Sequence, residues 1–369
     1  VDKDNYAITD QATTSANIST KELTVIGLLS SDKSYDGNPN AQIFGTAVLQ
    51  NEVSSALGSS TDRSPYSGDD LLINSGSVSA EFNDKNVLLA NRVSFSGLAL
   101  SGTDTGNYKL LLHADVSNVI RPKTVELSAN RIYDGTIDLT GNDVTITTGV
   151  GSETLNHTGG TSSSKDVAVL NKYIDGITLE NATDGSGGLS SNYQKPILNV
   201  SNAPVTITKK TVNLSANRIY NGTIDLTGND VTITTGVGSE TLSYSGGTSS
   251  SKDVAILYKY IDGITLENAI DGSGGLSSNY QNPSLDAVNA PVTISKKMVN
   301  LSASRIYDGT IDLVGTDVTI TTGVGSETLS HSGTSASSKD VAVSNKYIDA
   351  VTLVDATDGS GGLASNYKL

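Results

Sequence analysis

Lys123-Thr-Val-Glu-Leu-Ser-Ala-Asn-Arg-Ile-Tyr-Asp-Gly-Thr136 is a stretch that the chain repeats with few changes from Lys210 and from Lys297. Its tyrosine recurs at a constant interval of 87 residues (220 − 133 and 307 − 220). A shorter copy, Lys33-Ser-Tyr-Asp-Gly37, occurs earlier. A fixed period identifies a repeat architecture, and this one is too long for a solenoid repeat but long enough for a small domain. The period therefore predicts a tandem array of domains.

The repeats divide the 369 residues into one short piece and four longer ones. We expect residues 1–21 to be an orphan closing strand, of a preceding unit or donated to a neighbouring one. The remaining pieces are named here by their order in the chain: segment 1 (22–122), segment 2 (123–209), segment 3 (210–296) and segment 4 (297–369), which lacks its closing strand.

Short apolar runs with period two characterise every segment. Val125 and Leu127, Val144 and Ile146, and Val205 and Ile207 alternate with polar residues, and Gly, Asn, Asp or Pro bound each run. This pattern is typical of half-buried strands. We predict an all-β fold, a tandem array of small beta-grasp-like or sandwich domains forming an elongated rod roughly 150 Å long.

Composition narrows the class of function. The net charge is −15, which disfavours nucleic acid and anionic membranes as partners. No stretch is apolar for long enough to insert into a membrane. The absence of cysteine suits a long surface protein that crosses membranes unfolded, so we expect an extracellular protein.

The two ends of the chain share a pattern. Asn5 precedes Lys21 by 16 residues, and Asn107 precedes Lys123 by the same interval (21 − 5 and 123 − 107). Residues 1–20 therefore resemble a closing strand, which segment 4 lacks. Strand donation from one copy into segment 4 of another would not close on itself and would generate a filament. The alternative is a fragment cut from a longer array.

Several motifs of segment 1 resemble a known family. Tyr35-Asp-Gly37, Phe82-Asn-Asp-Lys-Asn-Val87, Val93-Ser-Phe-Ser-Gly-Leu-Ala-Leu-Ser-Gly102 and Gly106-Asn-Tyr108 are similar to the YDG or MBG (mostly beta grasp) repeats of large bacterial surface adhesins of the filamentous-haemagglutinin type. Segments 2 and 4 keep Tyr-Asp-Gly and segment 3 has Tyr-Asn-Gly; all three keep Asn-Tyr but have a shorter middle. The resemblance implies a stalk or spacer of an exported adhesin at the bacterial cell surface, without enzymatic activity.

The Tyr-Asp-Gly motif is predicted to be a structural turn. Segment 3 has Asn221 where segment 2 has Asp134, and a catalytic or metal-binding carboxylate could not be replaced by an amide. We expect Arg131 and Tyr133, on one strand face, to stack at the interface between segments. The predicted turn residues are Tyr35, Asp36, Gly37, Tyr133, Asp134, Gly135, Tyr220, Asn221, Gly222, Tyr307, Asp308 and Gly309.

Calcium is the alternative interpretation of the acidic loops, and no other cofactor is expected. Asp184, in Asp-Gly-Ser-Gly-Gly, and its counterparts Asp271 and Asp358 are weak calcium candidates. The bidentate Glu of an EF-type loop is missing. A calcium ion between domains would draw on Asp138, Asp143 or Asp175.

No catalytic constellation emerges from the sequence. His157 and His331 occupy one repeat position, which Tyr244 takes in segment 3, and His113 stands alone. A hydrolase triad requires one arranged histidine, so we expect no enzyme.

The leading hypothesis is a spacer or filament that contacts other copies of itself or adjacent repeats of a longer chain. The alternative is a glycan- or protein-binding module in segment 1, centred on Pro65, Tyr66, Asp69 and Asp70. Glycan sites usually expose aromatic rings, and the chain has only three Phe and no Trp.

Overall fold

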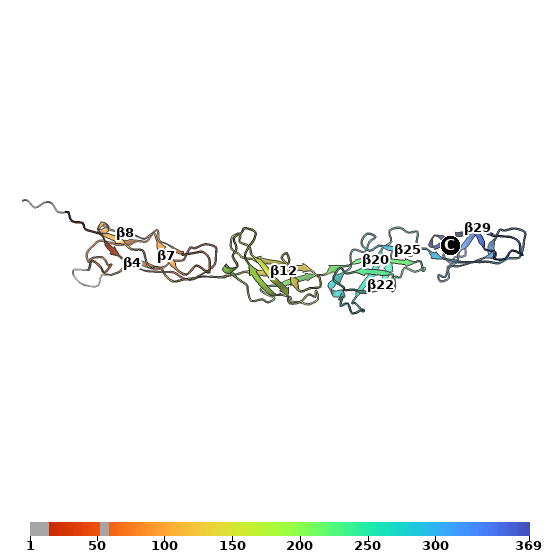
Figure 1. The fold of residues 1–369 in the computed structure, drawn as a ribbon, viewed down its shortest axis with the longest axis horizontal. Coiled ribbons are helices and arrows are strands. Elements are labelled where there is room, and N and C mark those ends of the chain that lie inside the picture. Colours follow the sequence, from red (N-terminus) through yellow and green to blue (C-terminus); the bar gives the residue numbers. More distant parts are fainter. Residues whose placement is uncertain (1–14, 52–58) are drawn as a thin grey trace, which may run out of the picture. The chain divides into compact units, whose positions relative to one another are not determined.

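A computed structural model describes residues 15–51 and 59–369. The regular elements in this part of the chain are β-strands and three-residue 3-10 turns, and none is an α-helix (Figure 1). The predicted all-β class is confirmed, whereas the tandem rod remains a prediction. Most of the proposed donor strand, residues 1–14, lies outside the described residues.

The chain clusters into two compact units. One holds the described residues up to Ser128 with Leu139–Thr161 and Tyr173–Pro204, and the other holds Ala129–Asp138, Ser162–Lys172 and Val205–Leu369. All the boundaries between these two units lie within segment 2. Within the described ranges, no helix is long and apolar enough to cross a bilayer.

Segment 1 is built from short pairs of strands. β2 pairs with β4, β5 with β8 and β6 with β7, all antiparallel, whereas β1–β9 and β10–β3 are parallel. Its elements are β1 Lys21–Leu23, β2 Val25–Leu29, β3 Lys33–Ser34, β4 Phe44–Leu49, β5 Leu72–Asn74, β6 Ser79–Phe82, β7 Val93–Ser96, β8 Ala99–Ser101, η2 Thr105–Asn107, β9 Tyr108–Leu110 and β10 Ile120–Arg121.

Segments 2 and 3 have the same order of elements, apart from an additional two-residue strand, β13, in segment 2. Segment 2 contains β11 Lys123–Thr124, β12 Glu126–Ile132, β13 Asp138–Leu139, β14 Val144–Thr147, β15 Asn156–Ser162, β16 Ile174–Glu180, η3 Ser190–Asn192, β17 Tyr193–Gln194 and β18 Val205–Thr208. Segment 3 contains β19 Lys210–Thr211, β20 Asn213–Ile219, β21 Val231–Thr234, β22 Ser243–Ser249, β23 Ile261–Glu267, η4 Ser277–Asn279, β24 Tyr280–Gln281 and β25 Val292–Ser295.

The central sheet of segment 3 mixes both pairing directions. β20 pairs antiparallel with β21 and parallel with β25, so the closing strand returns beside the opening one. Side chains along β20 alternate between exposed and buried, and Leu214, Ala216 and Arg218 face the core. β12 shows the same alternation and pairs in parallel with β18. One apolar face per strand explains the low apolar content of the sequence.

Segment 4 has a shorter opening strand. Its elements are β26 Lys297–Met298, β27 Asn300–Ala303, η5 Gly315–Asp317, β28 Val318–Thr321, β29 Ser330–Ala336, β30 Ile348–Val354, η6 Ala364–Asn366 and β31 Tyr367–Lys368. Among the described residues, β27 pairs with β28 alone, and it has four residues, where β12 and β20 each have seven.

Candidate functional site

A glutamate shared by two tyrosines joins each segment to the next. The Tyr220 hydroxyl donates to Glu327 Oε1 at 2.7 Å, and the Tyr367 hydroxyl donates to Glu327 Oε2 at 2.6 Å. The two rings meet edge to face, with centroids 5.4 Å apart. We call this arrangement the Tyr–Glu–Tyr cluster. It is formed by Tyr35, Glu153 and Tyr193, by Tyr133, Glu240 and Tyr280, and by Tyr220, Glu327 and Tyr367.

The protonation states of the cluster follow from its burial. Burial, with the hydrogen bond to Glu153, raises the pKa of Tyr35 to about 12. Burial alone would raise the pKa of Glu327, but hydrogen bonds from Tyr367, Tyr220 and Lys252 outweigh it and lower that pKa. Burial also raises the pKa values of Tyr220 and Tyr367, so in the cluster around Glu327 the phenols are neutral donors to an ionised acceptor. This charge-assisted arrangement is stronger than a neutral hydrogen bond.

The glycine of each Tyr-Asp-Gly turn fits closely against the following segment. Gly222 has φ of +85°, and a Cβ placed on it would lie 2.6 Å from Val324 Cγ1. A Cβ placed on Gly135 would lie 2.6 Å from Val237 Cγ1, and one placed on Gly37 would lie 2.9 Å from Val150 Cγ1. Glycine is therefore required at these turns both for its backbone conformation and for the approach of the valine.

An asparagine supplies a second contact between segments. Asn366 is fully buried, its Oδ1 accepts from the backbone N–H of Val254 at 2.8 Å, and its Nδ2 donates to Asp253 at 2.9 Å. Asn279 makes the same pair of bonds with Val167 and Asp166. Asn192 does so with Val87 and Asn86.

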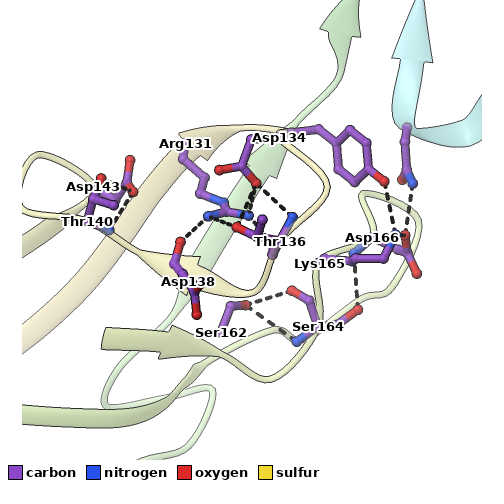
Figure 2. A network of polar contacts seen from close by, with 12 residues as sticks. Arg131, Asp134, Thr136, Asp138, Thr140, Asp143, Ser162, Ser164, Lys165 and Asp166 are labelled. Atoms are coloured by element: carbon purple, nitrogen blue, oxygen red, sulfur yellow. Dashed lines mark hydrogen bonds and ion pairs between the residues drawn. The ribbon is translucent and has the colours of Figure 1, made fainter. Parts of the chain in front are cut away.

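The turn itself is held by a buried arginine. Figure 2 shows the Arg131 guanidinium enclosed by the turn, where it donates to Asp134 and to the carbonyl oxygens of Thr136 and Asp138. The expectation that Arg131 stacks at the interface is wrong, because the loop's carbonyl groups draw its side chain into the turn. Of these two residues, it is Tyr133 that contacts the next segment, through its hydrogen bond to Glu240.

Asn221 makes the hydrogen bonds to the following threonine that the equivalent aspartate makes in segment 2. Its Oδ1 accepts from the Thr223 N–H at 3.1 Å, as Asp134 Oδ1 accepts from that of Thr136 at 2.9 Å. In segment 4, Asp308 Oδ1 accepts from Thr310 at 2.9 Å. In segment 1, Asp36 Oδ1 accepts from the Asn38 N–H at 3.2 Å.

Segment 4 carries a groove where segments 2 and 3 carry their closing strands. Its volume is about 660 Å³, and we call it the β27 groove. In segment 3, Ile294 of β25 is buried and pairs with Arg218, whose counterpart Arg305 lines the groove. Residues that line the groove include Leu301, Ala303, Arg305, Leu313, Tyr347 and Ile348.

The described part of the predicted donor strand is open to solvent. Residues 15–20 are all exposed, and the side chain of Ile18 is 98% exposed. Ile18 lies three positions before Lys21, as Ile207 lies three before Lys210 and Ile294 three before Lys297 (21 − 18, 210 − 207, 297 − 294). Ile207 and Ile294 are both buried in closing strands.

The calcium candidates hold together loops within their own segments. Asp271 accepts from Thr241 Oγ1 at 2.6 Å and from the Ser273 N–H at 3.0 Å. These hydrogen bonds, that of Thr241 first, lower the pKa of Asp271 to about 2. Asp184 and Asp358 make the same contacts and have the same lowered pKa. Among the described residues, no group of three or more acidic, histidine or cysteine side chains is placed to hold a metal ion, Asp138, Asp143 and Asp175 included.

The three histidines belong to three different segments. His157 is on β15 and His331 on β29, and both are half-buried, as is His113 in the loop after β9. His113 Nε2 accepts from the backbone N–H of Leu28 at 3.2 Å.

The predicted ligand site of segment 1 belongs to a turn around Tyr108. The Tyr108 hydroxyl donates to Asp69 and accepts from the N–H of Tyr66. The ammonium of Lys21 lies 3.8 Å from the centroid of the Tyr66 ring. Asp70 instead accepts from the Thr103 N–H, and Pro65 is half-buried.

Sequence reasoning missed the glutamates of the junctions, and it gave no contact role to the asparagines of the Asn-Tyr motif. Both residues recur at the 87-residue period (240 − 153, 327 − 240; 279 − 192, 366 − 279), and for the glutamates this repetition was the sole signal. Because the repeats are near-identical, most positions recur at this period. Recurrence therefore could not show that Glu327 contacts Tyr220.

Comparison with known proteins identifies one part of the chain. No curated protein and no solved structure matches it. The family model described as the YDG domain matches residues 19–117. Segment 1, which carries Tyr35-Asp-Gly37, thus lies almost entirely within the match, and residues 19–117 are a YDG domain.

Proposed function

We propose that this chain is an extracellular structural and adhesive repeat protein, a stalk or filament of a bacterial surface adhesin. Its copies join head to tail when residues 1–20 of one copy enter the β27 groove of another. The observation that supports this proposal is that, in the part of the chain that the structure describes, β27 pairs only with β28, whereas β20 pairs with both β21 and β25.

The unpaired edge of β27 offers backbone groups to an incoming strand. Ala216, Asn217, Arg218 and Ile219 pair with β25, and the equivalent residues of segment 4 are 303–306. An exposed strand edge is a template for pairing with another chain. A donated strand would restore the pairing that extends β20 to seven residues.

The donor segment has suitable chemistry. Ala16 and Ile18 alternate with Asn17 and Ser19, so one face is apolar and the other polar, as in Val205-Thr-Ile-Thr208. Full burial of an isoleucine side chain contributes about 1.5–3 kcal/mol. Main-chain hydrogen bonds add to this, so association does not depend on the side chains alone.

The experiment is sedimentation analysis over a range of concentrations, together with electron micrographs. We expect concentration-dependent oligomers that lengthen into filaments. Ile18→Asp places a charge in the groove and should abolish them. Ile197→Asp, at an exposed isoleucine of segment 2, is the matched control and should leave them unchanged.

A synthetic peptide of residues 1–20 provides a second test. It should bind the chain and shorten the oligomers, because it occupies the groove without carrying a further segment. The same peptide with Ile18→Asp should not compete. A strictly monomeric protein at high concentration contradicts the polymer.

A ligand site on segment 1 has less support. Lys21 already covers one face of the Tyr66 ring, and the Asp69 carboxylate already accepts a bond from Tyr108. A glycan array with wild type and Tyr66→Ala would detect this alternative as binding that the substitution removes.

A further inference from the structure

We propose that a second contact accompanies strand donation, in which the Tyr307–Gly309 turn and Lys339–Val341 of one copy dock on Tyr66, Asp69 and Asn107 of the next. The partner is a second copy of this chain. The inference rests on the proposed head-to-tail assembly and deepens it, because it names the surfaces that meet and predicts a fourth Tyr–Glu–Tyr type of cluster with aspartate in place of glutamate.

The turn face of segment 4 has no partner within residues 15–51 and 59–369. Tyr307 is 56% exposed, whereas its counterparts Tyr133 and Tyr220 are at most 1% exposed. A Cβ on Gly309 would meet no atom within 4 Å, although its φ of +85° equals that of Gly222. The turn is nevertheless already formed, since Arg305 donates to Thr310 and Asp312 as Arg218 donates to Thr223 and Asp225.

The neighbouring loop of segment 4 is also preformed and exposed. Lys339-Asp-Val341 follows Lys252-Asp-Val254 by one period (339 − 252 = 87). The Asp340 N–H donates to Ser338 Oγ at 3.1 Å, as that of Asp253 donates to Ser251 Oγ at 3.1 Å. Val254 is half-buried, but Val341 is 77% exposed.

Segment 1 presents the complementary face. The Asp69 N–H donates to the Tyr66 carbonyl, three residues earlier, as the Glu153 N–H donates to that of Val150. Tyr108 donates to Asp69 as Tyr193 donates to Glu153. Tyr66 therefore corresponds to Val150, against which the glycine of the preceding turn packs. Asp69 corresponds to Glu153, the glutamate shared by two tyrosines.

Asn107 is the residue of this face that corresponds to the buried junction asparagines. Asn107 precedes Tyr108 at the end of a 3-10 turn, as Asn192 precedes Tyr193. Asn192 is fully buried by Asn86 and Val87, whereas Asn107 is exposed. Among residues 15–51 and 59–369, no partner takes the place of Asn86 and Val87 for its side chain.

The donor strand would bring the two faces together. Lys21 pairs with Tyr108 in the register in which Lys210 pairs with Tyr280. Ile18 precedes Lys21 by three positions, as Ile294 of the closing strand β25 precedes Lys297. A copy whose Ile18 occupies the β27 groove thus places its Tyr108 beside Tyr307 of the other copy, as β25 leads to Tyr367 beside Tyr220.

A charge exchange tests the contact in full-length protein. Lys252 lies 3.4 Å from Glu327, so Lys339 should lie beside Asp69 of the next copy. We expect Asp69→Lys or Lys339→Asp to weaken self-association about tenfold, and the double variant to recover most of it. Tyr307→Phe should also weaken it about tenfold. Tyr258→Phe, at an exposed tyrosine of segment 3, is the control and should have no effect.

The outcomes separate this inference from the proposed function. If Ile18→Asp abolishes association but Tyr307→Phe and both charge variants associate like wild type, strand donation stands and the docking contact is overturned. If the single charge variants weaken association and the double variant does not recover it, the pairing of Lys339 with Asp69 is overturned. Wild type that never associates overturns both proposals.

Discussion

The hydroxyl of Tyr220 reaches the carboxylate of Glu327, a residue 107 positions later in the chain, at 2.7 Å. The tyrosine comes from the turn of one segment and the glutamate from the body of the next. Because Tyr367 binds the other carboxylate oxygen, one ionised side chain satisfies two buried phenols. This arrangement couples consecutive segments without a separate linker.

Removal of that carboxylate should loosen the junction. Glu327→Ala leaves the hydroxyls of Tyr220 and Tyr367 buried without their acceptor, which we expect to lower the free energy of unfolding by about 3 kcal/mol. Calorimetry of the monomeric Ile18→Asp background measures the effect. Glu267→Ala, at an exposed glutamate of β23, is the control and should change stability by less than about 0.5 kcal/mol. Equal effects of the two substitutions would contradict a role for the cluster.

The glycines of the turns allow a matched comparison. Gly222 and Gly309 share φ of +85°, so alanine carries similar backbone strain at both. Only at Gly222 would its Cβ clash with a neighbour, Val324. Gly222→Ala should therefore destabilise the monomeric background more than Gly309→Ala, by about 1–3 kcal/mol. Chemical denaturation measures the difference, and equal losses would show that the turn does not press on the next segment.

Alkaline pH should weaken the junction of segments 1 and 2. The pKa of Tyr35 rises from 10.0 to about 12 on folding, so the folded state holds the phenol proton more tightly than the unfolded state. The resulting stability is complete below pH 10 and is lost as pH rises through about 12. Thermal unfolding across this range should show a smaller alkaline loss for Tyr35→Phe than for wild type. An unchanged alkaline profile would contradict the assigned shift.

The sequence predicted much of this fold but not its junctions. Alternation along 123–136 predicted strands, and the strands are there. The Tyr-Asp-Gly motif predicted a turn. The predicted contact of Arg131 with the next segment was wrong, because the alternation of a strand gives the face on which a side chain lies but does not show that the side chain folds back onto its own loop. Glu153 was missed because its partners Tyr35 and Tyr193 are 118 and 40 positions away, and local patterns do not encode such pairs.

Acidic pH should release the loops that hold Asp184, Asp271 and Asp358. Hydrogen bonds from Thr241 and Ser273 lower the pKa of Asp271 from 3.8 to about 2, and the other two aspartates have equivalent partners. Because the folded pKa lies below the unfolded value, the stability is present above pH 3.8 and is lost as pH falls through about 2. Thr241→Val removes the first of these bonds, so the Asp271 carboxyl, followed by NMR, should titrate nearer to 3.8. Thr265→Val, at an exposed strand threonine, should leave that titration unchanged, and a titration of Asp271 that Thr241→Val does not move would show that the hydroxyl is not the cause.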